Sequence, residues 1–290
     1  MTTTTTTTTT TDPTPTAPTG PVLVLGGTGT TGRRVAQRLR EAGHDVRIAS
    51  RAGRPPFEWA DPATWGPLLD GASAAYVAHA PDLAAPGAPD VVTAFAREAV
   101  RCGVDRLVLL SGRGEEEARR AEDQVRRAAP GTVVVRASFF MQDFDEKLLV
   151  DQVRAGLVRL PVGAVREPFV DAEDVAAVAA VALTDPRHAG TTYEVSGPEL
   201  LTFAQALALV SAATGRDVRF QEIPVDEHRR ELLGQGVPAE VVDLLTYLFT
   251  EVLDGRGERL SRGVQDALGR EPGSFADYAR RAAATGAWDR

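Results

Sequence analysis

Three glycines stand at a regular spacing near the beginning of the chain. Gly26, Gly29 and Gly32 follow the short apolar run Val22–Leu25 and precede an amphipathic stretch, residues 33–42. In a strand–turn–helix unit the first glycine permits a tight turn, the second lets the backbone approach a pyrophosphate, and the third lets the helix pack on the strand. The pattern predicts a dinucleotide-binding loop at the positive end of a helix. We expect the ligand to contact Gly26, Thr28, Gly29, Thr30, Thr31 and Gly32.

A second informative position lies about 20 residues further on, where the next strand should end. An acid there would accept a hydrogen bond from the 2′-hydroxyl of NAD, but the sequence has Ser50 and Arg51, with Arg54 following and no carboxylate. An arginine can pair with the 2′-phosphate of NADP instead. The alternative is that Arg51 is only a solvated surface residue. We expect NADP(H) as the cofactor, with Ser50, Arg51 and Arg54 beside it.

The hydrophobic pattern predicts the elements that would hold these residues. Strands are expected at residues 22–25, 45–50, 74–78, 106–110 and 132–136, and helices at 33–42, 90–102 and 115–128. Strands alternating with helices of this length imply right-handed βαβ units and a parallel sheet. The prediction is an α/β protein, a doubly wound parallel-sheet Rossmann fold with a small C-terminal substrate-binding lobe.

The second half of the chain has a looser pattern. Short strands are expected at 157–160, 167–170 and 192–195, and helices at 173–183, 203–213, 225–233, 239–253 and 274–284. We assign the cofactor-binding core mainly to residues 21–138 and 166–196, and the lobe mainly to 139–165 and 197–290. The threonine- and proline-rich residues 1–20 have little apolar surface, and we expect them to form a disordered tail.

Charged residues cluster between positions 115 and 127. Their spacing, for example Glu115 to Arg119 and Glu122 to Arg126, is that of i,i+4 ion pairs on a helix. We interpret this segment as a solvated helix face rather than a binding surface.

Composition excludes several classes of function. The 290 residues carry 32 basic and 40 acidic side chains, a net charge of -8, which argues against nucleic-acid binding. The single cysteine, Cys102, cannot form an intramolecular disulfide or a Cys-rich zinc site, and we expect no metal. No apolar run is long enough to span a membrane. We expect a cytoplasmic protein whose partner is a small-molecule substrate, with the oligomeric state left open.

Several segments together resemble the NmrA-like group of atypical short-chain dehydrogenase/reductases. They are the turn Gly26-Gly27-Thr28-Gly29, the strand end Leu109-Leu110-Ser111, residues 136–144, in which Ala137 replaces a usual proline, and residues 168–175. This resemblance implies a Rossmann core carrying NADPH and a small substrate lobe. It also implies that further strand ends face the cofactor, namely Ala78, His79, Ala80, Ser111, Gly112, Ala137, Ser138 and Phe139.

The proton donor of the wider superfamily is missing. Its tyrosine gives a proton to the substrate carbonyl, and a lysine four residues later lowers the tyrosine pKa. The one lysine of this chain is Lys147, and Asp143 stands four residues before it. The Tyr-x-x-x-Lys dyad is therefore absent, and Lys147 is expected to be exposed on a helix.

Two functions follow. The first is an NADPH-dependent reductase of a ketone or quinone carbonyl, with an aromatic or polyketide-type substrate. The proton would come from Ser111, from His79, or from a phenol of the substrate itself. The alternative is a non-catalytic NADP(H) sensor that acts through protein partners.

Two parts of the second half are expected to serve the substrate. The residues expected to form an apolar wall for it are Phe139, Phe140, Met141 and Phe169. The helix pair within residues 225–253 could act as a lid that excludes water. For both features, plain structural packing is the alternative.

Overall fold

The computed structural model describes residues 20–289. The expected disordered tail lies outside the described residues, with the exception of Gly20. The carbonyl of Gly20 accepts a hydrogen bond from the Ser73 hydroxyl (2.9 Å), so Gly20 contacts the core rather than belonging to the expected tail.

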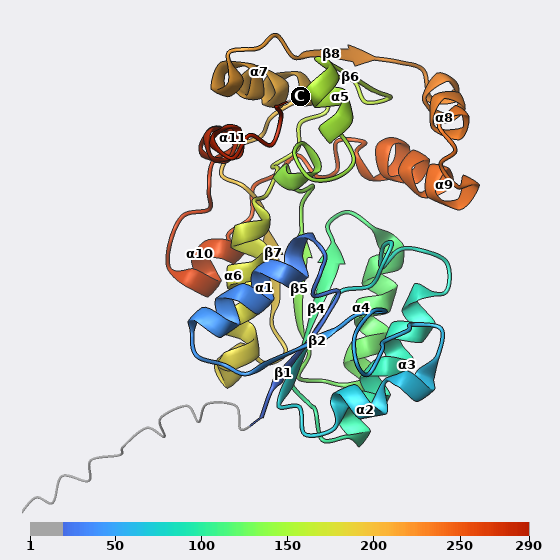
Figure 1. Cartoon of the computed structure of the whole chain (residues 1–290), viewed down its shortest axis with the longest axis vertical. Helices are drawn as coiled ribbons and strands as arrows, with labels where there is room; N and C mark the ends of the chain where they lie inside the picture. Colours follow the sequence, from blue (N-terminus) through green and yellow to red (C-terminus); the bar gives the residue numbers. More distant parts are fainter. Residues whose placement is uncertain (1–19, 290) are drawn as a thin grey trace, which may run out of the picture.

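A six-stranded parallel sheet forms the centre of the molecule (Figure 1), which confirms the predicted fold class. The strand order is β2-β1-β3-β4-β5-β7, and every neighbouring pair is parallel. The strands are β1 (Val22–Leu25), β2 (Val46–Ala49), β3 (Ala74–Val77), β4 (Leu107–Gly112), β5 (Val133–Ala137) and β7 (Thr192–Val195). The inner strands are apolar because both of their faces are covered.

The sheet ends at β2 because residues 50–73 form no further strand. This stretch holds only a 3-10 turn, η1 (Pro62–Thr64), and the short helix α2 (Gly66–Leu69). Its aromatic side chains Phe57 and Trp65 pack edge to face on Phe95, with ring centroids 6.1 and 5.6 Å away. The segment therefore covers the sheet instead of extending it.

Helices cover both faces of the sheet (Figure 1). One face carries α2, α3 (Ala88–Arg101) and α4 (Glu116–Ala128), and the other carries α1 (Thr30–Glu41), α6 (Ala172–Thr184) and α10 (Gly263–Leu268). The amphipathic pattern of α1 explains its position, since Val35 and Leu39 are buried against the sheet. Helix α10 lies in a range assigned to the lobe, yet it packs against α6 and β7.

The remaining segments build the C-terminal lobe at the carboxyl ends of the strands (Figure 1). A two-stranded parallel sheet joins β6 (Leu157–Leu160) to β8 (Arg219–Glu222). Around it lie η2 (Met141–Asp143), α5 (Val150–Ala155), α7 (Phe203–Thr214), α8 (Val225–Gly234), α9 (Ala239–Tyr247), η4 (Leu248–Val252) and α11 (Phe275–Ala284). The short 3-10 turn η3 (Pro186–His188) belongs to the core, where it connects α6 to β7.

Aromatic rings fill the interior of this lobe. Phe169 contacts Phe144, Phe203 and Phe275 with ring centroids 5.1–5.6 Å apart. The strand expected at residues 167–170 is wrong, because this segment makes only the isolated bridges Phe140–Val170 and Glu167–Leu201. Among residues 20–289, no helix has the length and apolarity needed to cross a membrane.

Candidate active site

The glycine turn after β1 has the geometry that its spacing predicts. Gly26 adopts a left-handed φ of 64°, and its carbonyl accepts the Gly29 N–H at 2.8 Å. A Cβ on Gly32 would lie 2.2 Å from that carbonyl, so only glycine fits there. A requirement that the sequence reasoning missed concerns Gly27, where a Cβ would lie 2.6 Å from Ile48 Cγ2 of β2. The turn leaves the N-terminus of α1 open to a ligand.

A pocket of about 470 Å³ extends from this turn across the carboxyl ends of β3, β4 and β5. Most of the expected cofactor residues line it. They are Gly26, Gly29, Thr30, Thr31, Ala78, His79, Ala80, Ser111, Gly112, Ala137, Ser138 and Phe139. Their positions suit an extended dinucleotide, with phosphates at the α1 N-terminus and the reactive ring at the ends of β4 and β5.

Five expected cofactor residues lie outside this pocket. Thr28 is exposed at the tip of the turn, and Gly32 is buried beneath it. Ser50, Arg51 and Arg54 follow β2, whose last residue pairs with Leu25 beside the turn. Both arginines are exposed, and within the described residues neither forms an ion pair with a carboxylate.

Two of the four expected substrate residues reach the pocket. Phe139 and Phe140 line it, whereas Met141 and Phe169 are fully buried in the lobe and do not. Phe169 supports Phe139 from behind, with ring centroids 5.9 Å apart. Met141 and Phe169 therefore serve the packing of the lobe, which was the alternative to a substrate contact.

An apolar wall that the sequence reasoning did not assign comes from α9 and η4. Val241, Leu244, Leu245, Leu248, Val252 and the following Leu253 line the pocket on the lobe side. The expected helix at 239–253 changes to π-helical turns at Leu248–Val252. Such turns are rare and frequently found at functional sites. The segment proposed as a lid thus forms one side of the pocket.

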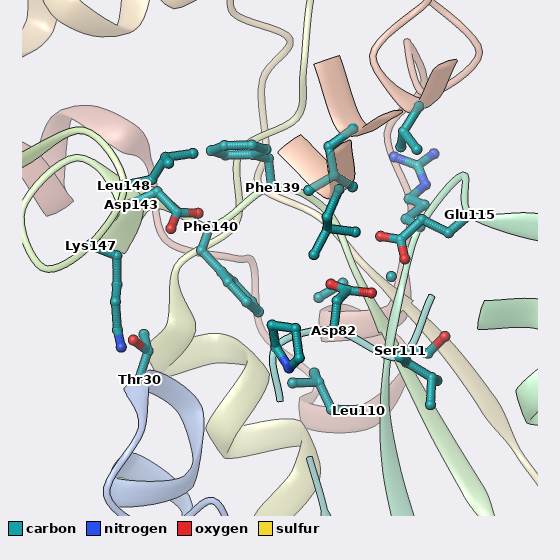
Figure 2. A pocket seen from close by; sticks show the side chains of 18 of the residues that line it. Thr30, Asp82, Leu110, Ser111, Glu115, Phe139, Phe140, Asp143, Lys147 and Leu148 are labelled. Atoms are coloured by element: carbon teal, nitrogen blue, oxygen red, sulfur yellow. The ribbon is translucent and has the colours of Figure 1, made fainter. Parts of the chain in front are cut away.

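The Ser111 hydroxyl points away from the pocket interior (Figure 2). It donates to Glu122 Oε1 at 2.5 Å, and Glu122 also pairs with Arg136 of β5. Arg136 in turn pairs with Glu194 of β7 at 2.9 Å. Because its proton is held by a buried carboxylate, this geometry argues against Ser111 as the donor to a substrate carbonyl.

This network also corrects the interpretation of the charged segment. Glu115 and Glu122 are buried, 6% and 3% exposed, and neither makes its expected i,i+4 pair. An i,i+4 pair that has formed on this helix joins Glu116 to Arg120, at 2.8 Å on its exposed face. The signal that was overlooked is position, because Glu115 directly follows the end of β4, where ligands of α/β sheets bind.

His79 also lines the pocket but is poorly suited to give a proton. Its Nδ1 donates to the Asp82 carbonyl at 3.0 Å, which leaves Nε2 of the neutral ring without a proton. Burial lowers the pKa of His79, although the nearby Asp82 opposes this effect. The neutral form is therefore favoured at pH 7.

Acidic side chains from four segments line the pocket: Asp82, Glu115, Asp143 and Glu167. Burial raises the pKa of Asp143 to about 7, against the influence of Lys147. Burial likewise raises the pKa of Glu167 to about 7, although the Phe139 N–H donates to it at 3.2 Å. The sequence reasoning assigned none of these acids to the site.

Lys147 is exposed, as expected, but it lies in turns between η2 and α5 rather than on a helix. Figure 2 shows its side chain extending toward Thr30 of the α1 N-terminus, at one end of the pocket. Its ammonium group adds positive charge to the end where the phosphates are expected.

The parallel sheet, the glycine turn and the strand-end pocket together define a Rossmann-type protein. The sequence profile of the NmrA-like family matches residues 120–267. The chain is 32% identical over 275 residues to the uncharacterized oxidoreductase YesF of Bacillus subtilis, covering 91% of this chain and 96% of that protein. The chain belongs to the NmrA-like family of atypical short-chain dehydrogenase/reductases, which confirms the resemblance noted above.

Two further comparisons extend this picture. An NAD(P)H azoreductase of Xenophilus azovorans is 30% identical over 292 residues, covering 92% of this chain and 99% of that protein. The quinone oxidoreductase QOR2 of Escherichia coli, solved with NADPH, has the same fold with a TM-score of 0.77. It is 16% identical, and the superposition covers 90% of this chain and 99% of that one.

Proposed function

We propose that this protein is an NADPH-dependent oxidoreductase that reduces a ketone or quinone carbonyl of a small aromatic or polyketide-type compound. The observation that carries the proposal is the continuity of the pocket. It joins a phosphate-binding turn to an apolar cavity over the ends of β4 and β5, where Gly112 and Ala137 lie. A dinucleotide and a second small molecule can therefore meet inside one pocket.

The cofactor assignment rests on charge and on the relatives. Arg51 and Arg54 are exposed after β2 without a carboxylate partner among residues 20–289, so a 2′-phosphate would give them one. The azoreductase relative is named for NAD(P)H, and the quinone oxidoreductase of the same fold was solved with NADPH. When bound, the dinucleotide supplies the hydride.

The substrate assignment rests on the walls of the pocket. Phe139 and Phe140 form one side, and the leucines of α9 and η4 form another. These apolar walls favour a largely apolar molecule. They would also exclude water from the reacting carbon.

The test is to follow NADPH oxidation at its absorbance band with quinones, hydroxylated aromatic ketones and an azo dye. We expect turnover with at least one carbonyl compound and weaker or no turnover with NADH. Reduction of the azo dye alone would contradict the proposed substrate class. Tight NADPH binding without turnover of any compound would favour the alternative, an NADP(H) sensor that acts through protein partners.

A further inference from the structure

Two carboxyl groups face one another in the part of the pocket next to Ser111. Asp82 lies in the loop after β3, and Glu115 lies between β4 and α4. Figure 2 shows their carboxyl groups directed toward each other across the pocket. The Glu115 carboxyl also covers Gly112, since a Cβ on Gly112 would lie 1.9 Å from Glu115 Oε1. Glu115 is thus at the strand end where the reactive ring of a dinucleotide is expected.

Glu115 is buried without a partner for one of its oxygens. The residue is 6% exposed, and within the described chain its Oε2 makes no hydrogen bond. Asp82, by contrast, accepts the Ala84 N–H at 2.7 Å through Oδ1. An ionised and unpartnered carboxylate would be costly at this depth, so Glu115 favours the protonated form.

The charges around Glu115 act in the same direction. Burial raises the pKa of Glu115 well above its usual range, and the nearby Asp82 raises it further. Glu117 and Glu122 of α4 add to this effect. The positively charged residue of the same loop, Arg113, has other partners. It faces Glu194 at 3.5 Å and donates to Ser138.

The four tyrosine hydroxyls, which could replace a carboxyl donor, are occupied elsewhere. Tyr76 donates to Thr31 at 2.9 Å, Tyr247 to Glu117 at 3.1 Å, and Tyr278 to Asp145 at 2.8 Å. Tyr193 contacts His188 at 2.6 Å and does not line the pocket. Asp143 is a competitor because burial raises its pKa to about 7, but Figure 2 shows it at the Lys147 end of the pocket, whereas Glu115 lies on the Ser111 side.

We propose that Glu115 is the proton donor of the reaction and that Asp82 is a positioning residue that keeps Glu115 protonated. This inference rests on the proposed function and names its missing acid. The pair would replace the absent tyrosine and lysine with a carboxylic acid and a neighbouring carboxylate. Two acids in apolar surroundings commonly share a proton in this way.

The reaction adds a hydride and a proton to the carbonyl group of the substrate. The carbonyl carbon gains a hydride, its C=O π electrons move to the oxygen, and the oxygen takes the Glu115 proton. The O–H bond of Glu115 breaks as the new O–H bond of the alcohol forms, and the dinucleotide is oxidised by two electrons. Glu115 is left as a carboxylate beside Asp82, and this repulsion favours its return to the acid by uptake of a proton from water.

The first test compares Glu115→Gln with wild type on para-naphthoquinone and on juglone, which carries a phenol beside one carbonyl. The amide keeps the size of the side chain but cannot give up a proton. We expect kcat on para-naphthoquinone to fall by about 100-fold or more, and the loss on juglone to be smaller. Glu116→Gln is the matched control, because Glu116 is exposed and outside the pocket. An unchanged kcat, or a loss confined to Asp143→Asn, would overturn the assignment.

The second test needs neither cofactor nor substrate. In the infrared spectrum of the free protein at pH 8, wild type should show a carboxylic-acid band that Glu115→Gln lacks and Glu116→Gln keeps. Asp82→Asn removes a negative neighbour and should move both this band and the alkaline limb of kcat/KM to lower pH. Identical spectra or an unmoved pH limb would overturn the roles given to the pair.

The two proposals fail in different ways. If wild type oxidises NADPH with a carbonyl compound but Glu115→Gln does so equally fast, only the inference about Glu115 is overturned. If wild type reduces nothing, the proposed function fails and the inference falls with it. NADPH affinity, measured by fluorescence titration, should be the same in wild type and Glu115→Gln within about threefold.

Discussion

Arg51 and Arg54 occupy the place where the choice between the two dinucleotides is made. β2 runs beside β1 with Ala49 opposite Leu25, so the loop that follows begins next to the glycine turn. The Ser50 carbonyl holds this loop by accepting the Gly53 and Phe57 N–H groups, each at 3.0 Å. Both arginines are exposed, and within residues 20–289 neither has a carboxylate partner, so both can pair with a phosphate.

Substituting Arg51 by alanine should weaken NADPH binding and leave NADH binding almost unchanged. Loss of one charge-assisted contact to the 2′-phosphate corresponds to about a tenfold rise in Kd. Fluorescence titration with both dinucleotides measures this. Arg40→Ala is the control, since Arg40 is exposed on α1, away from the turn. Equal losses for NADPH and NADH would contradict the role of Arg51.

The glycine and acid positions differ in how well sequence predicts them. Gly26 and Gly32 are recognisable because a φ of 64° strongly favours glycine at the first and a contact of 2.2 Å excludes any side chain at the second, which leaves a fixed spacing. Glu115 has no such signature. Its helical spacing to Arg119 suggests a surface pair, and only the tertiary structure shows that it precedes α4 and turns into the pocket.

Polar contacts fix the segment formed by α8, α9 and η4 both to β6 of the lobe, through the ion pairs of Arg159 with Glu227 and Glu231, and to the core. Arg229 of α8 donates to Thr246 at 2.8 Å and to Asp243 at 2.7 Å, which joins the two helices. The Tyr247 hydroxyl reaches Glu117 of α4 at 3.1 Å and so connects the segment to the core. Burial, with the Glu117 carboxylate, raises the pKa of Tyr247 to about 12, so this donor is retained at neutral pH.

Removing this connection should loosen the wall that the segment contributes to the pocket. For Tyr247→Phe we expect KM for the carbonyl substrate to rise about 3- to 10-fold, the equivalent of one hydrogen bond, with the Kd for NADPH unchanged. Tyr193→Phe is the control, because its hydroxyl contacts His188 outside the pocket. An unchanged KM would remove the proposal that the segment acts as a lid.

The existence of this helical pair is predictable from its apolar periodicity, but its position is not. Leu244, Leu245 and Leu248 satisfy a helical face that could pack on any neighbour. Phe249 is the buried residue of the π-helical turns. The strand β8 was missed because its residues are mostly exposed and polar.

Ion pairs hold the core and the lobe together, and buried acids lie near the same boundary. The stability that the ion pairs contribute is lost in acid, whereas the stability linked to the buried acids is lost as pH rises. Arg34 of α1 pairs with Glu146 at 2.6 Å and with Glu173 at 2.9 Å. Although burial opposes ionisation, hydrogen bonds from Arg34 and Arg33 lower the pKa of Glu146, so this stabilisation is lost only in acid. Burial raises the pKa of Glu167 to about 7, and its stabilising effect is lost as pH rises.

Glu167 makes stability fall with rising pH because its pKa is higher in the folded chain than in the unfolded chain. Below about pH 4.3 the carboxyl is protonated in both folded and unfolded chains, and between there and about pH 7 only the folded chain retains the proton. Ionisation at higher pH then costs the folded protein on the order of 1–3 kcal/mol. Arg113 opposes this cost and Glu258 adds to it.

Thermal melts across pH 5 to 8 should therefore show a higher Tm at the acidic end. Glu167→Gln removes the ionisation while its amide oxygen can still accept the Phe139 N–H, so its Tm should fall less between pH 5 and 8. Glu116→Gln should keep the wild-type slope, because its ion pair is exposed. A Glu167→Gln profile parallel to wild type would contradict this account.

The single lysine and the single cysteine lie at opposite ends of the strands of the sheet. Lys147 is exposed beside the pocket at the carboxyl ends of the strands, whereas the half-buried Cys102 follows α3 near the amino end of β4. Amine and thiol reagents each have one side-chain target among the 290 residues. The natural sequence therefore offers two distinct attachment points for a pair of dyes, one of them at the pocket and the other at a fixed reference in the core.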